Sequence, residues 1–168
     1  ERIINIANKI QEKKIENINF HLIGDGSERK RLIKYAEKKN LKNIFFYNRL
    51  PMHKIKSFYE KMDILLINSN LKGNEAIIIP SKLQSYLSTK KPIISFCEGA
   101  VEKVIEDSKS GLNLSKKNIT DSAKEIIKLS KNKKKIFLFG KNGRIYYEEN
   151  FKIHNIIKKL ENIFISKL

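Results

Sequence analysis

Residues 21–69, HLIGDGSERKRLIKYAEKKNLKNIFFYNRLPMHKIKSFYEKMDILLINS, contain three short apolar runs separated by two amphipathic segments. The runs predict buried strands, and the segments, whose apolar residues recur every three or four positions, predict helices. The strands are expected at 18–24, 43–47 and 63–68, and the helices at 28–39 and 51–61. Strands that alternate with helices pair in parallel through right-handed crossovers. Because the strands are continuously apolar, we expect a parallel α/β sheet covered on both faces.

The same alternation continues on both sides of this stretch. A helix with Ile3, Ile4, Ala7 and Ile10 on one face precedes it, and a polar loop at 69–75 follows it. The later helices are expected at 80–88, 100–107, 120–131, 133–149 and 152–168, with strands at 92–96 and 111–114. We therefore predict one Rossmann-like, doubly wound domain over residues 1–168.

Composition limits the class of protein. Of the 168 residues, 40% are hydrophobic, which is enough to form a core, and the single cysteine, Cys97, excludes an internal disulfide and a multi-cysteine zinc site. No apolar run approaches the roughly 18–20 residues of a membrane span, and no leader peptide is visible. We expect a cytoplasmic protein, with peripheral attachment to the inner face of the cell membrane left open.

The net charge of +17 has two interpretations. It indicates an anionic partner, such as nucleic acid, phosphates or an acidic membrane surface, or it reflects compositional drift. Lysines occur on nearly every expected helix, so we favour drift for most of the charge, with a modest attraction to anionic lipid still open. The last helix has Ile153, Ile156, Ile157 and Leu160 at helical spacing. We favour packing on this or another domain over binding at a membrane surface.

The loops that follow the strands hold the candidate binding residues, because ligands of doubly wound sheets bind beyond the carboxyl ends of the strands. We expect one cleft lined by the loops at 24–27, 47–51, 68–81 and 97–100.

Two motifs in these loops suggest phosphate binding. Gly24 and Gly26 follow a strand, but Arg29 stands where a dinucleotide fingerprint has its third glycine, so we expect no NAD site. Pro80 begins a helix whose first N–H groups have no partner within the helix. Ser81 adds a hydroxyl and Lys82 a positive charge, so this helix start predicts a diphosphate seat. The scattered histidines lack metal-ligand spacing, and we expect no metal.

The order of these motifs resembles the C-terminal domain of the retaining GT-B glycosyltransferases of family four. Residues 21–69 are similar to that family's G-x-G-P/S-E, G-R-V/L-P and A-D-V/I-L-L segments. IPSKLQSYLSTKKPIISF at 79–96 is similar to its P-S-K-x-x-E-Y-x-x-x-G-K-P-V/I segment. GLNL at 111–114 and GKNGRIYYEENF at 140–151 match its later motifs, so the resemblance covers nearly the whole chain.

The resemblance implies roles for matching residues. Backbone around Arg49 and Leu50 would bind the nucleotide base, Ser81 and Lys82 would meet the donor diphosphate, and the glycines at 24 and 26 would keep the floor of the cleft open.

The chain departs from the family at the paired glutamates that bind the donor sugar and the ribose. Ile77 and Ser85 stand in their places. The first change fits transferases of O-antigen or capsule that use deoxyamino sugars, whereas Ser85, with Gln84, would still bond the ribose. Lys90 replaces a glycine that is usual in the family, which the sequence does not explain.

The resemblance implies that this chain binds a UDP-sugar or another nucleoside diphosphate sugar, without a cofactor. The intact enzyme would transfer the sugar, with retention, to a lipid-linked or surface-polysaccharide acceptor. The acceptor-binding N-terminal domain and the first strand of this domain would precede Glu1, so we expect this fragment alone to be inactive. Two alternatives are a nucleotide-sugar epimerase of GT-B fold and a basic nucleic-acid-binding module. The lack of an acid/base pair argues against the first, and the lack of an aromatic stacking platform argues against the second.

Overall fold

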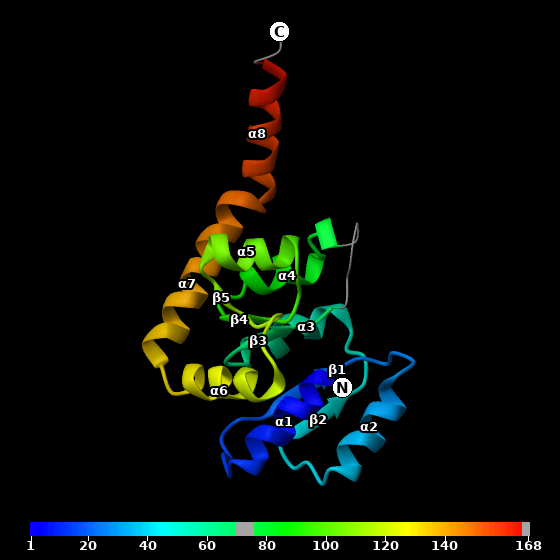
Figure 1. The fold of residues 1–168 in the computed structure, drawn as a ribbon. Helices are drawn as coiled ribbons and strands as arrows, with labels where there is room; N and C mark the ends of the chain where they lie inside the picture. Colours follow the sequence, from blue (N-terminus) through cyan, green and yellow to red (C-terminus); the bar gives the residue numbers. More distant parts are fainter. Residues whose placement is uncertain (70–75, 166–168) are drawn as a thin grey trace. The chain divides into compact units, whose positions relative to one another are not determined.

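The computed structural model describes residues 1–69 and 76–165 (Figure 1). Most of the loop predicted at 69–75 and the end of the last predicted helix lie outside the described residues. The chain divides into two compact units, Glu1–Phe58 with Lys117–Lys133, and Tyr59–Lys116 with Lys134–Leu168. The prediction of one domain over the whole chain stays a prediction.

The first unit is built on a two-stranded parallel sheet. Strand β1 (Phe20–Ile23) pairs with β2 (Ile44–Tyr47) in the register Phe20↔Ile44. Its helices are α1 (Arg2–Glu12), α2 (Arg29–Lys38), α6 (Ile119–Ser130) and most of α3 (Met52–Glu60). The apolar face predicted for the first helix is confirmed, because Ile3, Ile4, Ala7 and Ile10 are all buried and α1 packs against α6.

The second unit is built on a three-stranded parallel sheet in the order β3-β4-β5. The strands are β3 (Leu65–Ile67), β4 (Ile93–Ser95) and β5 (Gly111–Asn113). The helices are α4 (Ser81–Leu87), α5 (Ala100–Ser108), all but the first residue of α7 (Lys133–Asn150), and α8 (Ile153–Ile165). The core joins Leu83 and Leu87 of α4 to Ile93 of β4 and Val101 of α5. The predicted α/β class with parallel pairing is confirmed.

Helix α7 packs closely on the turn between α4 and β4. A Cβ atom at Gly140 would lie well under 3.0 Å from the Lys90 carbonyl oxygen, so only glycine fits there. Arg144 Nη1 donates to the Ser88 carbonyl at 2.9 Å on the same turn. Lys90 itself has φ 59°, in the left-handed region that favours glycine. The backbone conformation thus explains why glycine suits position 90.

One prediction about burial was wrong, and another stands only in part. All of β4 is buried, as predicted, but Phe45 of β2 is 42% exposed, so the first sheet is not fully covered among the described residues. The apolar residues of α8 are 39–75% exposed, so α8 does not pack on the described part of this chain. The reason is geometric, because α8 extends beyond the sheet and core of its unit (Figure 1). Packing on another domain, the other half of that interpretation, stays a prediction. No helix in the described part of the chain is long and apolar enough to cross a membrane.

Candidate functional site

The carboxyl ends of β1 and β2 are tied together by backbone and side-chain hydrogen bonds. The Gly24 N–H donates to the Tyr47 carbonyl at 3.1 Å, which extends the strand pairing by one residue. The Arg49 N–H then donates to Asp25 Oδ2 at 3.0 Å. Because this N–H is already bonded, any base contact near Arg49 must use the Arg49 carbonyl or the Leu50 N–H. The Arg49 N–H therefore does not take the base-binding role that was predicted for the backbone around Arg49 and Leu50.

The space beside the two loop glycines is open. A Cβ atom at Gly24 or Gly26 would meet no atom of the described residues within 4 Å. Gly24 has φ 144°, so it is needed for its backbone conformation as well. This fits the prediction that both glycines leave room for a ligand.

The side chain of His21 is held inside the first unit by aromatic neighbours. Its Nδ1 lies 2.9 Å from the Tyr47 hydroxyl, and its ring stacks on Phe45 with centroids 5.2 Å apart. Phe58 of α3 packs edge-on against Tyr47 at 5.4 Å. These contacts stabilise the end of β2, so we assign His21 a structural role. In the described ranges, no group of three or more His, Cys, Asp or Glu is placed to hold a metal ion.

In the second unit, α4 presents its polar residues away from the core. Pro80 is extended, with φ −69° and ψ 143°, and the helix begins at Ser81. Leu83, Tyr86 and Leu87 are buried, and this anchors the helix so that Ser81 and Lys82 are exposed at its first turn. The first-turn N–H groups of any helix lack intrahelical acceptors. In α4 the Leu83 N–H donates to the Pro80 carbonyl at 2.9 Å. The start of the helix therefore offers the N–H groups of Ser81 and Lys82, with a hydroxyl and a cation beside them.

The two candidate ribose contacts differ in what they offer. Gln84 is partly buried and Ser85 is exposed. Ser85 Oγ donates to the Ser81 carbonyl at 3.1 Å. Since that hydroxyl has one hydrogen and donates it within the helix, Ser85 can only accept a hydrogen bond from a ribose.

Gly99 holds the loop after β4 against the segment that leads into α4. It has φ 72°, and a Cβ atom there would lie well under 3.0 Å from the Ala76 carbonyl oxygen. A residue with a side chain would therefore be strained by its backbone and would collide with Ala76. Gly99 is the N-cap of α5, and three residues after it Glu102 accepts a hydrogen bond from Lys116 Nζ at 2.9 Å. The hydrogen bond from Lys116 is the main reason that the pKa of Glu102 is lowered.

The candidate residues form two groups, each within its own unit. The first group contains Gly24, Gly26, Arg49 and Leu50, and the second contains Ser81, Lys82, Gln84 and Ser85. A single cleft lined by both groups stays a prediction. Sequence reasoning missed the contacts that Asp25 and Gly99 make. An acidic residue between two glycines after a strand was the available signal for Asp25, but nothing local marked the close approach of Gly99 to Ala76.

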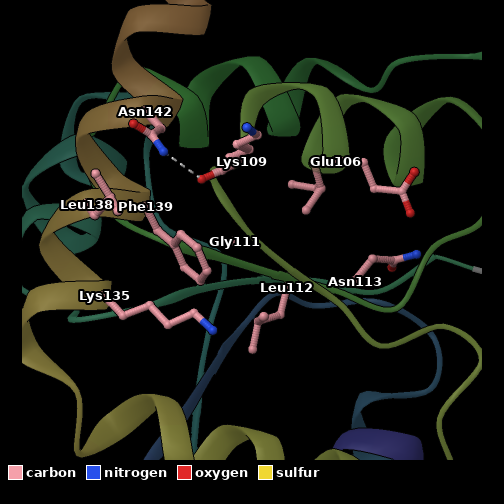
Figure 2. A pocket seen from close by; sticks show the side chains of 10 residues that line it. Glu106, Lys109, Gly111, Leu112, Asn113, Lys135, Leu138, Phe139 and Asn142 are labelled. Carbon is pink, nitrogen blue, oxygen red and sulfur yellow. Dashed lines mark hydrogen bonds between the residues drawn. The ribbon is translucent and has the colours of Figure 1, made fainter.

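A groove of about 390 Å³ lies elsewhere in the second unit (Figure 2). Phe139 points from α7 toward β5, and Asn142 Nδ2 donates to the Lys109 carbonyl at 3.1 Å. Lys109 and Gly111 lie at the amino end of β5, whereas ligands of such sheets bind beyond the carboxyl ends. The groove is thus separate from the candidate residues of α4. Its lining comprises Ile105, Glu106, Lys109, Gly111, Leu112, Asn113, Lys135, Leu138, Phe139 and Asn142.

Comparison with known families and sequences gives consistent matches. The family model described as glycosyl transferases group 1 matches residues 1–146. The poly(ribitol-phosphate) alpha-N-acetylglucosaminyltransferase of Staphylococcus aureus (strain COL) is 28% identical over 158 residues, covering 92% of this chain and 30% of that protein. An uncharacterized glycosyltransferase of Methanocaldococcus jannaschii is 30% identical over 149 residues, covering 89% of this chain and 37% of that protein. The chain therefore spans about a third of the length of the curated relatives it matches.

Solved structures show the same fold. TarM superposes with a TM-score of 0.79 at 26% identity, over 96% of this chain and 31% of that chain. Anabaena Alr3699/HepE, crystallised in complex with UDP, has a TM-score of 0.76 at 15% identity, over 96% of this chain and 44% of that chain. At that identity the second likeness shows the fold alone.

Proposed function

Because the chain belongs to the glycosyl transferases group 1 family, we propose that it is the donor-binding part of an enzyme that transfers a sugar from a nucleoside diphosphate sugar. The observation that carries this proposal is the exposed helix start of α4, with Ser81 and Lys82, inside a chain whose family match covers residues 1–146. Such a helix start binds anions through free N–H groups and the helix dipole.

The residues of the two units take complementary roles in this proposal. Either the Arg49 carbonyl or the Leu50 N–H binds the base, and Gly24 and Gly26 leave room for the ligand. The first turn of α4 binds the diphosphate, with Gln84 and Ser85 near the ribose. As the glycosidic bond breaks, negative charge builds on the leaving diphosphate, and the N–H groups and Lys82 stabilise it. We propose that transfer proceeds with retention and without a metal.

The donor and acceptor are proposed from the exposed residues and the relatives. Ile77 stands where the resemblance places a sugar-binding glutamate, and its side chain is 74% exposed. An apolar residue suits a donor that presents few hydroxyls, such as an acetylated or deoxyamino sugar. The S. aureus relative is named for transfer of N-acetylglucosamine to poly(ribitol-phosphate). An anionic surface polymer of this kind also fits a chain with net charge +17.

Calorimetric titration of the protein with UDP, UDP-N-acetylglucosamine and a UDP-deoxyamino sugar tests the proposal. We expect binding of UDP, and we expect Lys82→Ala to weaken it by about 1–2 kcal/mol, the scale of a charge-assisted hydrogen bond. Lys103→Ala is the matched control, because Lys103 is an exposed lysine on α5 paired with Asp107. It removes the same charge and should leave the affinity unchanged.

Three outcomes would overturn parts of the proposal. Unchanged affinity in Lys82→Ala would remove Lys82 from the site. Conversion of a free UDP-sugar without an acceptor would indicate an epimerase. RNA binding that survives physiological salt and displaces UDP would favour a nucleic-acid-binding protein instead.

A further inference from the structure

One face of α7 exposes bulky apolar side chains among cations. Phe137, Leu138 and Ile145 are 74%, 52% and 43% exposed. Lys134 and Lys141 are exposed as well, and all five residues recur with the period of a helix, so they share one face. We call this surface the α7 face.

The packing of α7 keeps this face outward. Gly140 and Gly143 are the buried residues of the helix. A Cβ atom at Gly140 would collide with the Lys90 carbonyl oxygen, so the backbone of the helix touches its neighbour directly at this point. Turning α7 to bury Phe137 would break that contact and bring residues with side chains against Lys90. The exposure of Phe137 therefore follows from how the helix is anchored.

The side chain of Lys90 adds a third cation beside this face. A groove of about 380 Å³ within the second unit is lined by Lys90, Phe137, Lys141, Arg144, Ile145 and Glu148. Arg144 Nε donates to Glu148 Oε1 at 2.7 Å, and this hydrogen bond is the main reason that the pKa of Glu148 is lowered. Neither Lys90 nor Lys141 is within ion-pair distance of a described carboxylate, so both ammonium groups can meet a ligand.

The backbone of Lys90 is held against its conformational preference. Its φ of 59° lies in the left-handed region, where glycine would be more stable. The side chain is exposed at the groove. Residues held in such conformations cluster at ligand sites, where the side chain has a use that compensates for the strain. The Lys90 ammonium is therefore a candidate ligand group.

The chemistry of the α7 face favours a lipid surface over a protein or a nucleic acid. Lysine is depleted in the core of protein interfaces. Single-stranded nucleic acids bind through several stacking aromatic rings, and of the residues that line the groove only Phe137 is aromatic. Phenylalanine, leucine and lysine together are typical of segments at the boundary of an anionic bilayer, where the apolar side chains enter the acyl region and the ammonium groups meet lipid phosphates.

We propose that the α7 face binds an anionic membrane surface, with lipid phosphates at Lys90 and Lys141 and with Phe137 inserted among the acyl chains. This contact needs no nucleotide, so it stands or fails independently of the proposed function.

Cosedimentation with lipid vesicles tests the proposal. We expect the protein to bind vesicles of phosphatidylcholine mixed with phosphatidylglycerol, less strongly at high salt, and to bind phosphatidylcholine alone weakly. Phe137→Ala should weaken binding to the mixed vesicles about tenfold, because an inserted apolar side chain is lost. Lys141→Gln should weaken it about fivefold.

Two matched controls accompany these variants. Lys103→Gln removes the same charge from α5, where Lys103 is paired with Asp107, and should change binding little. Met52→Ala removes an apolar side chain that is 87% exposed on α3, and it should also change binding little.

Lys90→Gly separates ligand binding from folding. Because glycine relieves the left-handed conformation, this variant should be at least as stable as the unsubstituted protein in urea denaturation. Its binding to the mixed vesicles should nevertheless fall about fivefold. A loss of binding in a variant that is no less stable cannot be ascribed to unfolding.

Several results would overturn the proposal. Equal binding to both kinds of vesicle, or to neither, would refute the role of lipid charge. Equal losses in Lys103→Gln and Lys141→Gln would show that binding follows the overall charge of the protein. Unchanged binding in Phe137→Ala and Lys90→Gly would place the lipid contact on another surface. RNA that displaces the protein from the mixed vesicles at physiological salt would assign the α7 face to nucleic acid.

Discussion

Replacing Gly140 by Ala should destabilise the protein, although alanine is the better helix former. Inside a helix this exchange contributes about 1 kcal/mol of stability by propensity alone. Here the added Cβ would overlap the Lys90 carbonyl oxygen, a backbone atom that cannot rotate away. Overpacking costs about 1–3 kcal/mol and occasionally more, and a backbone collision belongs at the upper end. We expect a net loss of about 2 kcal/mol.

Gly143→Ala is the matched control in the same helix. Its Cβ would lie 3.1 Å from Ser110 Cβ and 3.3 Å from Leu87 Cδ2, so a shift of a few tenths of an ångström would relieve the contact, far less than Gly140→Ala would need. The propensity gain is the same, so its net effect should be close to zero. Because about 1 kcal/mol shifts the Tm of a chain of this size by roughly 2–4 °C, Gly140→Ala should melt about 4–8 °C below the control.

Urea denaturation followed by circular dichroism gives the free energy of unfolding for both variants, and thermal melting gives the Tm. UDP affinity should fall in Gly140→Ala as well, because Lys90 follows α4 by only three residues and α4 carries the proposed diphosphate seat. If Gly140→Ala proves as stable as Gly143→Ala, the close packing of α7 on the α4–β4 turn is not as the structure describes it.

Three further predictions concern the second unit. Lys90→Gly should raise the free energy of unfolding, measured in urea, by about 0.5–1 kcal/mol, because relief of the left-handed conformation outweighs the extra freedom of glycine in the unfolded chain. Lys90→Ala should not raise it, and equal effects of the two substitutions would refute the backbone explanation. Gly99→Ala should cost about 2–4 kcal/mol by the same assay, from its positive φ and the collision with Ala76, whereas Gly26→Ala should be nearly neutral. The bond from Lys116 lowers the pKa of Glu102 below its ordinary value of 4.5, so its stabilisation is complete above that pH and is lost as pH falls through the lowered pKa. Glu102→Gln should therefore show a shallower loss of stability on acidification below pH 4.5, and an unchanged pH profile would exclude this ion pair.

The order and type of the elements followed from local patterns. The apolar face of α1 was predictable because a helix places every third or fourth residue on one side, and the core needs that side apolar. The candidate loops could also be predicted, because ligands of a parallel sheet bind beyond the carboxyl ends of its strands. Residue identity at Ser81 and Lys82 then predicted an anion seat, and the described helix begins where expected.

Burial at the edges of the units was less predictable. The pattern of Ile153, Ile156, Ile157 and Leu160 identified an amphipathic helix correctly, and α8 is helical there. The pattern does not say what covers the apolar face, because the same stripe suits a core, a partner or a surface. Phe45 raised the same difficulty on a strand, since an apolar residue in a sheet is buried only if another element lies over it.

The sequence by itself determined the succession of strands and helices and the residues available at the strand ends, because helix and strand periodicity are properties of neighbouring residues. Only the tertiary structure decided which backbone groups those residues meet. The bond from the Arg49 N–H to the Asp25 carboxylate, the close approach of Gly140 to the Lys90 carbonyl and the contact of Gly99 with Ala76 all join segments distant in sequence. Such contacts leave no local periodicity, so they become visible only when the chain is folded.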